Sequence, residues 1–148
     1  MKNINHKVKG VLEKLGILLP VFRVYEKIKS FHTKQNKIKS ADGLLLPPSY
    51  LMVLVAGSPD KHWFLEIGKK GATSIESVFA KNGIDISGFK NILDFGCGCG
   101  RVIRHFKYLS DAGTNLYGTD YNEKLVDWDR ENLKFADFTT NQLDPPLD

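Results

Sequence analysis

The chain has 148 residues, of which 42% are hydrophobic and 26% charged, and its formal net charge is +4. This length allows one domain with a stable core, and no apolar stretch is long enough to span a membrane or resembles a signal peptide. The two cysteines, Cys97 and Cys99, lie two apart in a glycine-rich turn, which excludes a disulfide framework and favours the cytosol.

The positive charge belongs to the N-terminal part of the chain. Residues 1–40 hold ten Lys or Arg and two acids, a balance of +8, whereas the remaining residues hold eleven and fifteen, a balance of −4. Two amphipathic helices are predicted here, the first ending at Gly16 and the second beginning at Pro20; their apolar faces are Val8, Val11, Leu12 and Leu15, then Val21, Val24, Tyr25 and Ile28. A polar linker follows, and we place the boundary at Asp42-Gly43, between an extension (1–42) and a domain (43–148).

The basic extension is open to several interpretations. Its helices could pack on the domain with their lysines in solvent, cap an active site, or lie on an anionic membrane surface. Nucleic acid is the least favoured partner, because aromatic residues are not interleaved with the cations. We therefore expect a cytoplasmic protein, with residues 1–40 as a candidate for peripheral contact with the inner membrane surface.

Two helices are expected before the central strand. Pro47-Pro48 forces an extended backbone, and residues 51–56 could form either a buried strand or an extended segment. Asp60 begins a helix that ends at Gly68 or Gly71, and the capping-box spacing of Thr73 and Glu76 begins another that ends at Gly83. Trp63 and Phe64, on the first of these helices, could line a site, but a core position is the favoured interpretation.

A strand, a glycine turn and a helix follow in that order. Ile92, Leu93 and Phe95 form a short apolar run typical of a buried strand, and Asp94 lies near its carboxyl end. Glycines at 96, 98 and 100 let the backbone turn sharply, and Val102, Phe106 and Leu109 then follow at helical spacing. This order is typical of nucleotide-binding crevices.

The spacing of the turn narrows the class of ligand. A dinucleotide fingerprint G-x-G-x-x-G would need a third glycine where Arg101 stands, and no Gly-Lys-Ser/Thr of a phosphate-binding loop follows. What remains is D-x-G-x-G-x-G, an acid directly before the glycine turn. Such a turn suits a ligand that carries both an ammonium group and a carboxylate.

The run from Ile92 to Arg101 resembles the first motif of class I S-adenosylmethionine-dependent methyltransferases. Two further elements support the resemblance: Leu116–Asp120 reads as a second strand ending in an acid, and Asn141 begins a segment similar to the one after strand three in a branch of the family. Asp120 lies 20 positions after Gly100, a spacing suited to a carboxylate that accepts the ribose hydroxyls.

The resemblance implies an α/β, Rossmann-like doubly wound sheet that binds S-adenosylmethionine. Asp94 is expected at the amino group, Arg101 at the carboxylate, Asp120 at the ribose, and Tyr121 and Asn141 at the adenine. The full set of expected cofactor-binding residues is Asp94, Phe95, Gly96, Cys97, Gly98, Gly100, Arg101, Asp120, Tyr121 and Asn141. The family's sheet has about seven strands; because only about three are expected here, we expect the chain to be the front part of a longer protein.

A helix and a third strand are expected after Asp120. After Asn122 we expect a helix with Leu125, Trp128 and Asn132 on one face, and with Asp127, Asp129, Arg130 and Glu131 turned outward. Leu133, Phe135 and Phe138 indicate strand three, with Asp137 inside it. No metal site is expected, because His105 stands alone near the cysteine pair and zinc needs four ligands. Arg104 is interpreted as a solvated surface residue.

The resemblance implies in-line transfer of a methyl group to an unidentified acceptor, either a small molecule or a glycan or lipid-linked precursor. No catalytic residue is assigned, because the base and the acceptor pocket usually follow strand four in this family. Two alternatives remain: an enzyme that binds NAD or another nucleotide, and a non-catalytic binding module.

Overall fold

The computed structural model describes Pro20, Val24 and residues 38–142. The chain divides into two compact units, residues 1–37 and 38–148, and only the second is described further. The predicted helices of residues 8–15 and 21–28, the linker up to residue 37, and the segment after Gln142 lie outside the described residues. None of the helices within the described part is long and apolar enough to cross a membrane.

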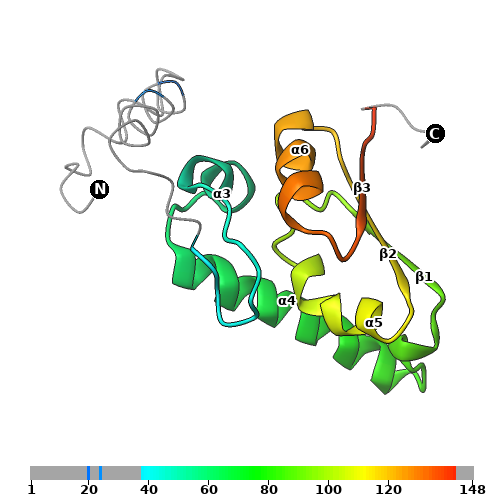
Figure 1. The fold of residues 1–148 in the computed structure, drawn as a ribbon. Helices are drawn as coiled ribbons and strands as arrows, with labels where there is room; N and C mark the ends of the chain where they lie inside the picture. Colours follow the sequence, from blue (N-terminus) through cyan, green and yellow to red (C-terminus); the bar gives the residue numbers. More distant parts are fainter. Residues whose placement is uncertain (1–19, 21–23, 25–37, 143–148) are drawn as a thin grey trace. The chain divides into compact units, whose positions relative to one another are not determined.

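Three parallel strands form a sheet along one side of the described part of the second unit (Figure 1). They are β1 (Asn91–Phe95), β2 (Asn115–Asp120) and β3 (Asp137–Thr140), and they lie side by side in that order. In parallel strands the carboxyl ends meet at one edge of the sheet. The prediction of an α/β, Rossmann-like sheet is therefore confirmed.

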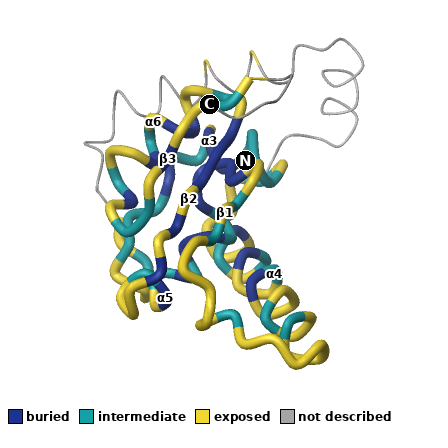
Figure 2. Tube along the Cα trace, turned by 90° about the vertical axis from the view of Figure 1, so that its right-hand side faces the viewer, coloured by how far each residue is buried: buried dark blue, intermediate teal, exposed yellow. Residues whose placement is uncertain are grey.

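The described helices cover one face of this sheet. Leu116 and Phe138, which are 2% and 5% exposed, point toward the helices. Leu93 pairs with Tyr117, and these two side chains are 47% and 37% exposed on the opposite face. The alternation of buried and exposed residues along the strands is visible in Figure 2. The apolar run of β1 is thus only partly buried within the described unit.

The connections after β1 and β2 supply the covering layer. After β1 the chain forms the 3-10 helix η2 (Ile103–Phe106) and then α5 (Lys107–Asp111); α6 (Glu123–Asn132) joins β2 to β3. The helix predicted after Arg101 is therefore shorter than expected and begins as a 3-10 turn. Ile103, Phe106 and Leu109 all lie in the core.

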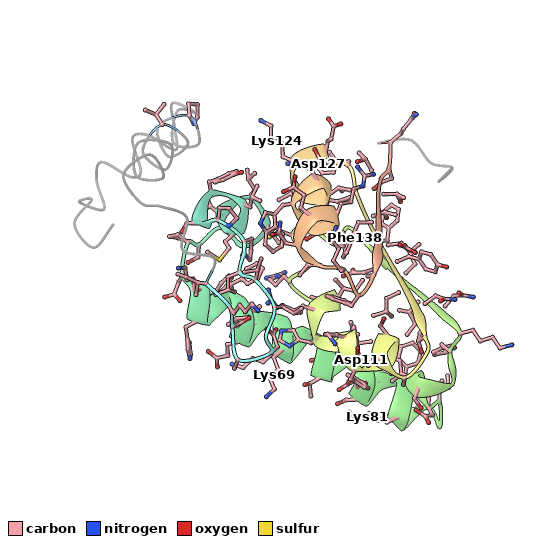
Figure 3. All side chains as sticks on the ribbon, in the orientation of Figure 1. Lys69, Lys81, Asp111, Lys124, Asp127 and Phe138 are labelled. Carbon is pink, nitrogen blue, oxygen red and sulfur yellow. The ribbon has the colours of Figure 1, made fainter. Side chains whose placement is uncertain are left out.

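A bulky side chain of β3 lies over the neighbouring strand β2. The ring of Phe138, labelled in Figure 3, lies across Gly118 of β2. A Cβ on Gly118 would come within 2.6 Å of that ring. Gly118 therefore leaves the space that the ring fills.

Residues 51–56 form neither a strand nor an extended segment. They belong to α3 (Ser49–Ala56), which begins after Pro48 and ends at Gly57, whose φ of +67° is left-handed. Leu51 and Met52 are fully buried and pack with Phe64. Proline at the start and glycine at the end are the usual limits of a helix. Because all residues from 51 to 56 are apolar, however, the sequence shows no helical spacing of apolar and polar residues.

The two helices predicted before β1 are a single helix, α4 (Lys61–Lys81). Its start is as expected, because the Asp60 side chain accepts a hydrogen bond from the Trp63 amide at 2.9 Å. Gly68 does not end the helix but lies against the backbone carbonyl of Arg101. Phe64 is fully buried, as predicted for a core residue, whereas Trp63 is 37% exposed.

An ion pair between the buried Arg104 and the more exposed Asp42 joins the segment before α3 to η2. Arg104, predicted to be a solvated residue, is only 1% exposed. Its Nε donates to Asp42 Oδ2 at 2.9 Å, and its Nη2 donates to Ser40 Oγ at 2.9 Å. Burial raises the pKa of Asp42, but hydrogen bonds from Arg104, Ser40 and the Leu44 amide outweigh it, so that the pKa is lowered. The ionised pair is therefore the stable form.

The contact between Gly68 and Arg101 predicts the effect of a methyl group at Gly68. The new Cβ would lie 2.2 Å from the Arg101 carbonyl oxygen, so α4 or the loop after β1 must shift. We expect Gly68→Ala to reduce the free energy of unfolding by about 1–3 kcal/mol, as over-packing does. Urea unfolding followed by circular dichroism measures this change.

Gly71→Ala is the matched control on the same helix. Its Cβ would meet only Val102 Cγ2, at 3.5 Å, an ordinary contact. The higher helix propensity of alanine should leave that variant as stable as the wild type or more stable by up to about 1 kcal/mol. Equal effects of the two substitutions would contradict the close contact at Gly68.

Candidate functional site

The loop that follows β1 owes its shape to three glycines. Gly96, Gly98 and Gly100 have φ values of +79°, +63° and +68°, a left-handed conformation that other residues adopt only with strain. Their alternate spacing makes the backbone turn repeatedly over a few residues, at the carboxyl end of the strand. The left-handed backbone at these three positions therefore explains why the D-x-G-x-G-x-G pattern has glycine at each of them.

Hydrogen bonds hold this loop against the end of β2. The amides of Gly96 and Cys97 donate to the Thr119 carbonyl at 2.7 and 2.9 Å. The Gly98 amide donates to Asp120 Oδ2 at 2.9 Å, and Asp120 Oδ1 accepts from the Asn122 amide at 2.9 Å. Asp120, which is 7% exposed, thus connects the glycine loop to the start of α6.

Asp120 keeps capacity for a ligand despite these bonds. Each oxygen of a carboxylate can accept two hydrogen bonds, and each oxygen of Asp120 accepts one from the backbone. Within the described part of the chain, the amides of Cys99 and Arg101 are the loop N–H groups without an acceptor; because Cys99 is fully buried, the Arg101 amide is the one left for a ligand. The loop therefore offers both a donor and an acceptor.

Asp94 is a carboxyl group with an unsatisfied oxygen. Its Oδ2 is buried without a hydrogen-bond partner among the described residues. Burial raises the pKa of Asp94, and the nearby Asp120 adds to this, while the Ile103 amide and the charge of Arg101 act in the opposite direction. A cationic ligand group at this oxygen would relieve the cost of burial.

Three more buried polar atoms near the strand ends lack hydrogen-bond partners among the described residues. They are Arg101 Nε, Thr119 Oγ1 and Asn141 Oδ1. Asn141 follows β3, and its amide donates to the Asp120 carbonyl at 3.2 Å, which ties it to the end of β2. Buried polar atoms are normally hydrogen-bonded. These atoms and Asp94 Oδ2 are therefore candidates for hydrogen bonds to a ligand.

The structure thus brings the predicted binding residues to one edge of the sheet. Asp94 and Phe95 end β1, residues 96–101 form the loop, and Asp120 ends β2. Phe95 and Tyr121 are 62% and 65% exposed there, so their rings are available to a ligand. The roles assigned to the individual residues remain predictions.

Helix α3 covers part of the loop, which the sequence did not indicate. A Cβ on Gly98 would lie 2.8 Å from Val55 Cγ2, so the α3 side chain sits directly on the loop backbone. Met52 and Leu51 of the same helix pack with Cys99 in one cluster. The segment before α4 is therefore part of the loop's packing.

The two cysteines are buried free thiols. Cys99 is fully buried and Cys97 is 4% exposed. Burial raises the pKa of both thiols well above the usual range, and the neighbouring Asp129 raises it further. Among the described residues, no three His, Cys, Asp or Glu side chains are grouped so as to hold a metal ion. Both thiols fill space inside the glycine turn.

Asp129 corrects the prediction for α6. We expected its side chain in solvent, but it is fully buried, with Oδ2 3.8 Å from Cys97 Sγ and Oδ1 without a partner. Burial raises its pKa to about 8; the nearby Asp120 and Asp94 act in the same direction, and the Cys97 hydrogen bond opposes them. The signal in the sequence was its place four residues after Leu125 and four before Leu133, both buried.

Comparisons with known proteins leave the family open. No family model matches the chain, and no curated protein matches it. One solved structure with similarity is a TehB-like SAM-dependent methyltransferase from Corynebacterium glutamicum ATCC 13032 Kitasato, 28% identical over 53% of this chain and 46% of that one, with a TM-score of 0.31. The match spans less than half of that protein. A TM-score this low does not establish the fold, which stands on the topology of the sheet.

Because both thiols are buried, we expect them to react slowly with a thiol reagent in the folded protein. Because the thiolate is the reactive form, and burial disfavours it at Cys97 and Cys99, both should react with Ellman's reagent far more slowly than an exposed cysteine at pH 8. In denaturant, both should react at once. The chain has only two cysteines, so the absorbance reports on them alone. Rapid reaction of the native protein would contradict the packing of the glycine turn.

Proposed function

We propose that this chain binds S-adenosylmethionine at the glycine loop and belongs to a methyltransferase that uses it. One observation carries the proposal: a loop turned by three left-handed glycines, with Asp94 just before it and Asp120 at the end of the adjacent parallel strand. The sequence resemblance points to the same residues.

The chemistry of the site suits the two ends of this ligand. Its ammonium group would meet the unpaired Oδ2 of Asp94, and its carboxylate would meet Arg101 Nε or the Arg101 amide. The ribose hydroxyls would donate to the remaining lone pairs of Asp120. Adenine would lie near the exposed ring of Tyr121 and the unpaired Oδ1 of Asn141, which can accept from its amino group.

A dinucleotide fits the same residues less well. Its pyrophosphate would approach the carboxyl group of Asp94, directly before the loop, and an ionised carboxylate would repel it. Arg101 also occupies the position of the third glycine of the fingerprint. The backbone after the loop forms a turn and a short 3-10 helix, so the long α-helix N-terminus that binds a pyrophosphate is missing from this position.

The mechanism would rely on position more than on acid–base chemistry. The bound cofactor supplies a methyl group on a sulfonium, which is already a strong electrophile. The residues of this chain would bind and orient it and keep water away from it, so that an acceptor can approach in line. We assign no general base to any described residue. A glycan, a lipid-linked precursor or a small molecule remains the proposed acceptor.

Contact of residues 1–40 with an anionic membrane surface is a separate proposal. It rests on the sequence alone, namely on the balance of +8 in that segment. Each cation near an anionic surface contributes about 1 kcal/mol. A protein held there would lie at the cytoplasmic side of the membrane, where lipid-linked acceptors are available.

Calorimetric titration with S-adenosylhomocysteine, and separately with NAD, tests the binding site. We expect saturable binding of S-adenosylhomocysteine and none of NAD. Asp94→Asn should weaken binding by about 1.5–3 kcal/mol, roughly tenfold to a hundredfold, because a hydrogen bond to a charged group is lost. Asp120→Ala should weaken it at least as much, because Asp120 also holds the loop.

Asp137→Asn is the matched control. Asp137 is an exposed acid in β3, away from the loop, and its removal should leave the affinity unchanged. Binding of NAD in place of S-adenosylhomocysteine would overturn the proposal. So would the absence of binding by a folded sample, or equal loss of affinity in all three variants.

A further inference from the structure

The buried acid Asp129 has no place in the binding scheme above, yet it lies directly behind the glycine loop. It has no exposed surface, so it cannot touch a ligand. Its Oδ2 lies 3.8 Å from Cys97 Sγ, and a Cβ on Gly100 would be 3.3 Å from its Oδ1. The carboxyl group therefore packs against two positions of the loop.

An ionised carboxylate at this position would be poorly compensated. Oδ1 has no hydrogen-bond partner among the described residues, and Oδ2 has only a weak thiol donor. Its titratable and charged neighbours come from the strand, the loop, β2 and η2; they are Asp94, Cys97, Cys99, Asp120 and Arg104. Arg104 is the cation of this group; its Nε and Nη2 are bonded to Asp42 and Ser40, its Nη1 is buried without a hydrogen-bond partner among the described residues, and its charge acts against the rise in the pKa of Asp129.

If Asp129 is a neutral carboxylic acid, no buried negative charge is left without a partner at this position. The neutral form removes one negative charge from a group that already holds Asp94 and Asp120, and it avoids burying an ion without a partner. A carboxylate would instead repel Asp120, whose Oδ2 holds the Gly98 amide. A negative charge on Asp129 would therefore act on the same acid that holds the Gly98 amide.

We propose that Asp129 is a positioning residue: as a neutral acid it supports the glycine loop in its binding conformation, and on losing its proton it loosens the loop and weakens cofactor binding. The proposal rests on the proposed function. The same site is then sensitive to alkaline pH through a residue that never contacts the cofactor.

Carbon-13 NMR of the Asp129 carboxyl group provides the first test, and it requires no substitution. We expect the chemical shift to titrate near or above neutral pH, in line with a pKa raised to about 8 by burial and by Asp120 and Asp94. Titration at the usual value for an aspartate, about 4, would overturn the proposal.

The second test compares S-adenosylhomocysteine binding by the wild type and by Asp129→Asn between pH 6 and pH 9.5. Asparagine has the shape of the neutral acid and cannot ionise. Above the titration of Asp129 we expect the wild-type affinity to fall by up to tenfold per pH unit relative to the variant. The variant also corrects for titration of the ligand's own amino group.

Asp127→Asn controls for loss of an acid from the same helix. Asp127, labelled in Figure 3, is exposed and pairs with Arg130 at 3.2 Å, so its removal should leave the wild-type pH profile. Matching profiles of the wild type and Asp129→Asn, with binding intact, would overturn the role of Asp129 alone. Absence of S-adenosylhomocysteine binding at every pH would overturn the proposed function, and this proposal with it.

Unfolding in urea distinguishes a structural effect from an effect on binding. The native carboxyl keeps its proton at pH values where the unfolded chain has lost it. The stability of the wild type relative to Asp129→Asn should therefore fall as the pH rises from about 4 to about 8 and stay level above. If stability showed this dependence while affinity did not, Asp129 would be a structural residue and the proposal would be wrong.

Discussion

The hydrogen bond from the Gly98 amide to Asp120 is the constraint on which the site depends. It joins the loop after β1 to the end of β2, and two more loop amides reach the Thr119 carbonyl beside it. Asp120 also accepts from the start of α6, and its carbonyl accepts from Asn141 after β3. One acidic residue therefore connects all three strand ends. A ligand bound there would meet groups whose positions are already set, which reduces the cost of ordering them on binding.

Charge gives this edge of the sheet its selectivity. Asp94 and Asp120 lie at the carboxyl ends of β1 and β2, and Asp129 is buried behind the loop. Arg104, a buried cation nearby, is paired with Asp42. In the proposed site, the buried, unpaired Oδ2 of Asp94 would favour a ligand that carries a positive group. The buried Nε of Arg101, which has no hydrogen-bond partner among the described residues, would be a donor for an anionic end.

The parts of the fold that follow from local chemistry could be predicted from the sequence. The strand from Asn91, the left-handed glycines and the cap at Asn122 depend on residues close together in the chain, and each is present as expected. The errors concern residues whose role depends on distant partners. The sequence predicts a helix end at Gly68, because the close approach of the Arg101 carbonyl is visible only in the structure. It predicts a surface position for Arg104, because the pairing with Asp42 joins residues far apart in the chain. Asp129 was misplaced because its charge was given more weight than its position between Leu125 and Leu133.

The central claim is that the glycine loop and the ends of the three strands form one cofactor site. Amide chemical shifts of the nitrogen-15-labelled chain, recorded while S-adenosylhomocysteine is added, test it residue by residue. We expect the largest shifts on residues 94–101, 120–122 and 141, with little change along α4. Shifts confined to other parts of the chain, or no shifts at saturating ligand, would contradict it.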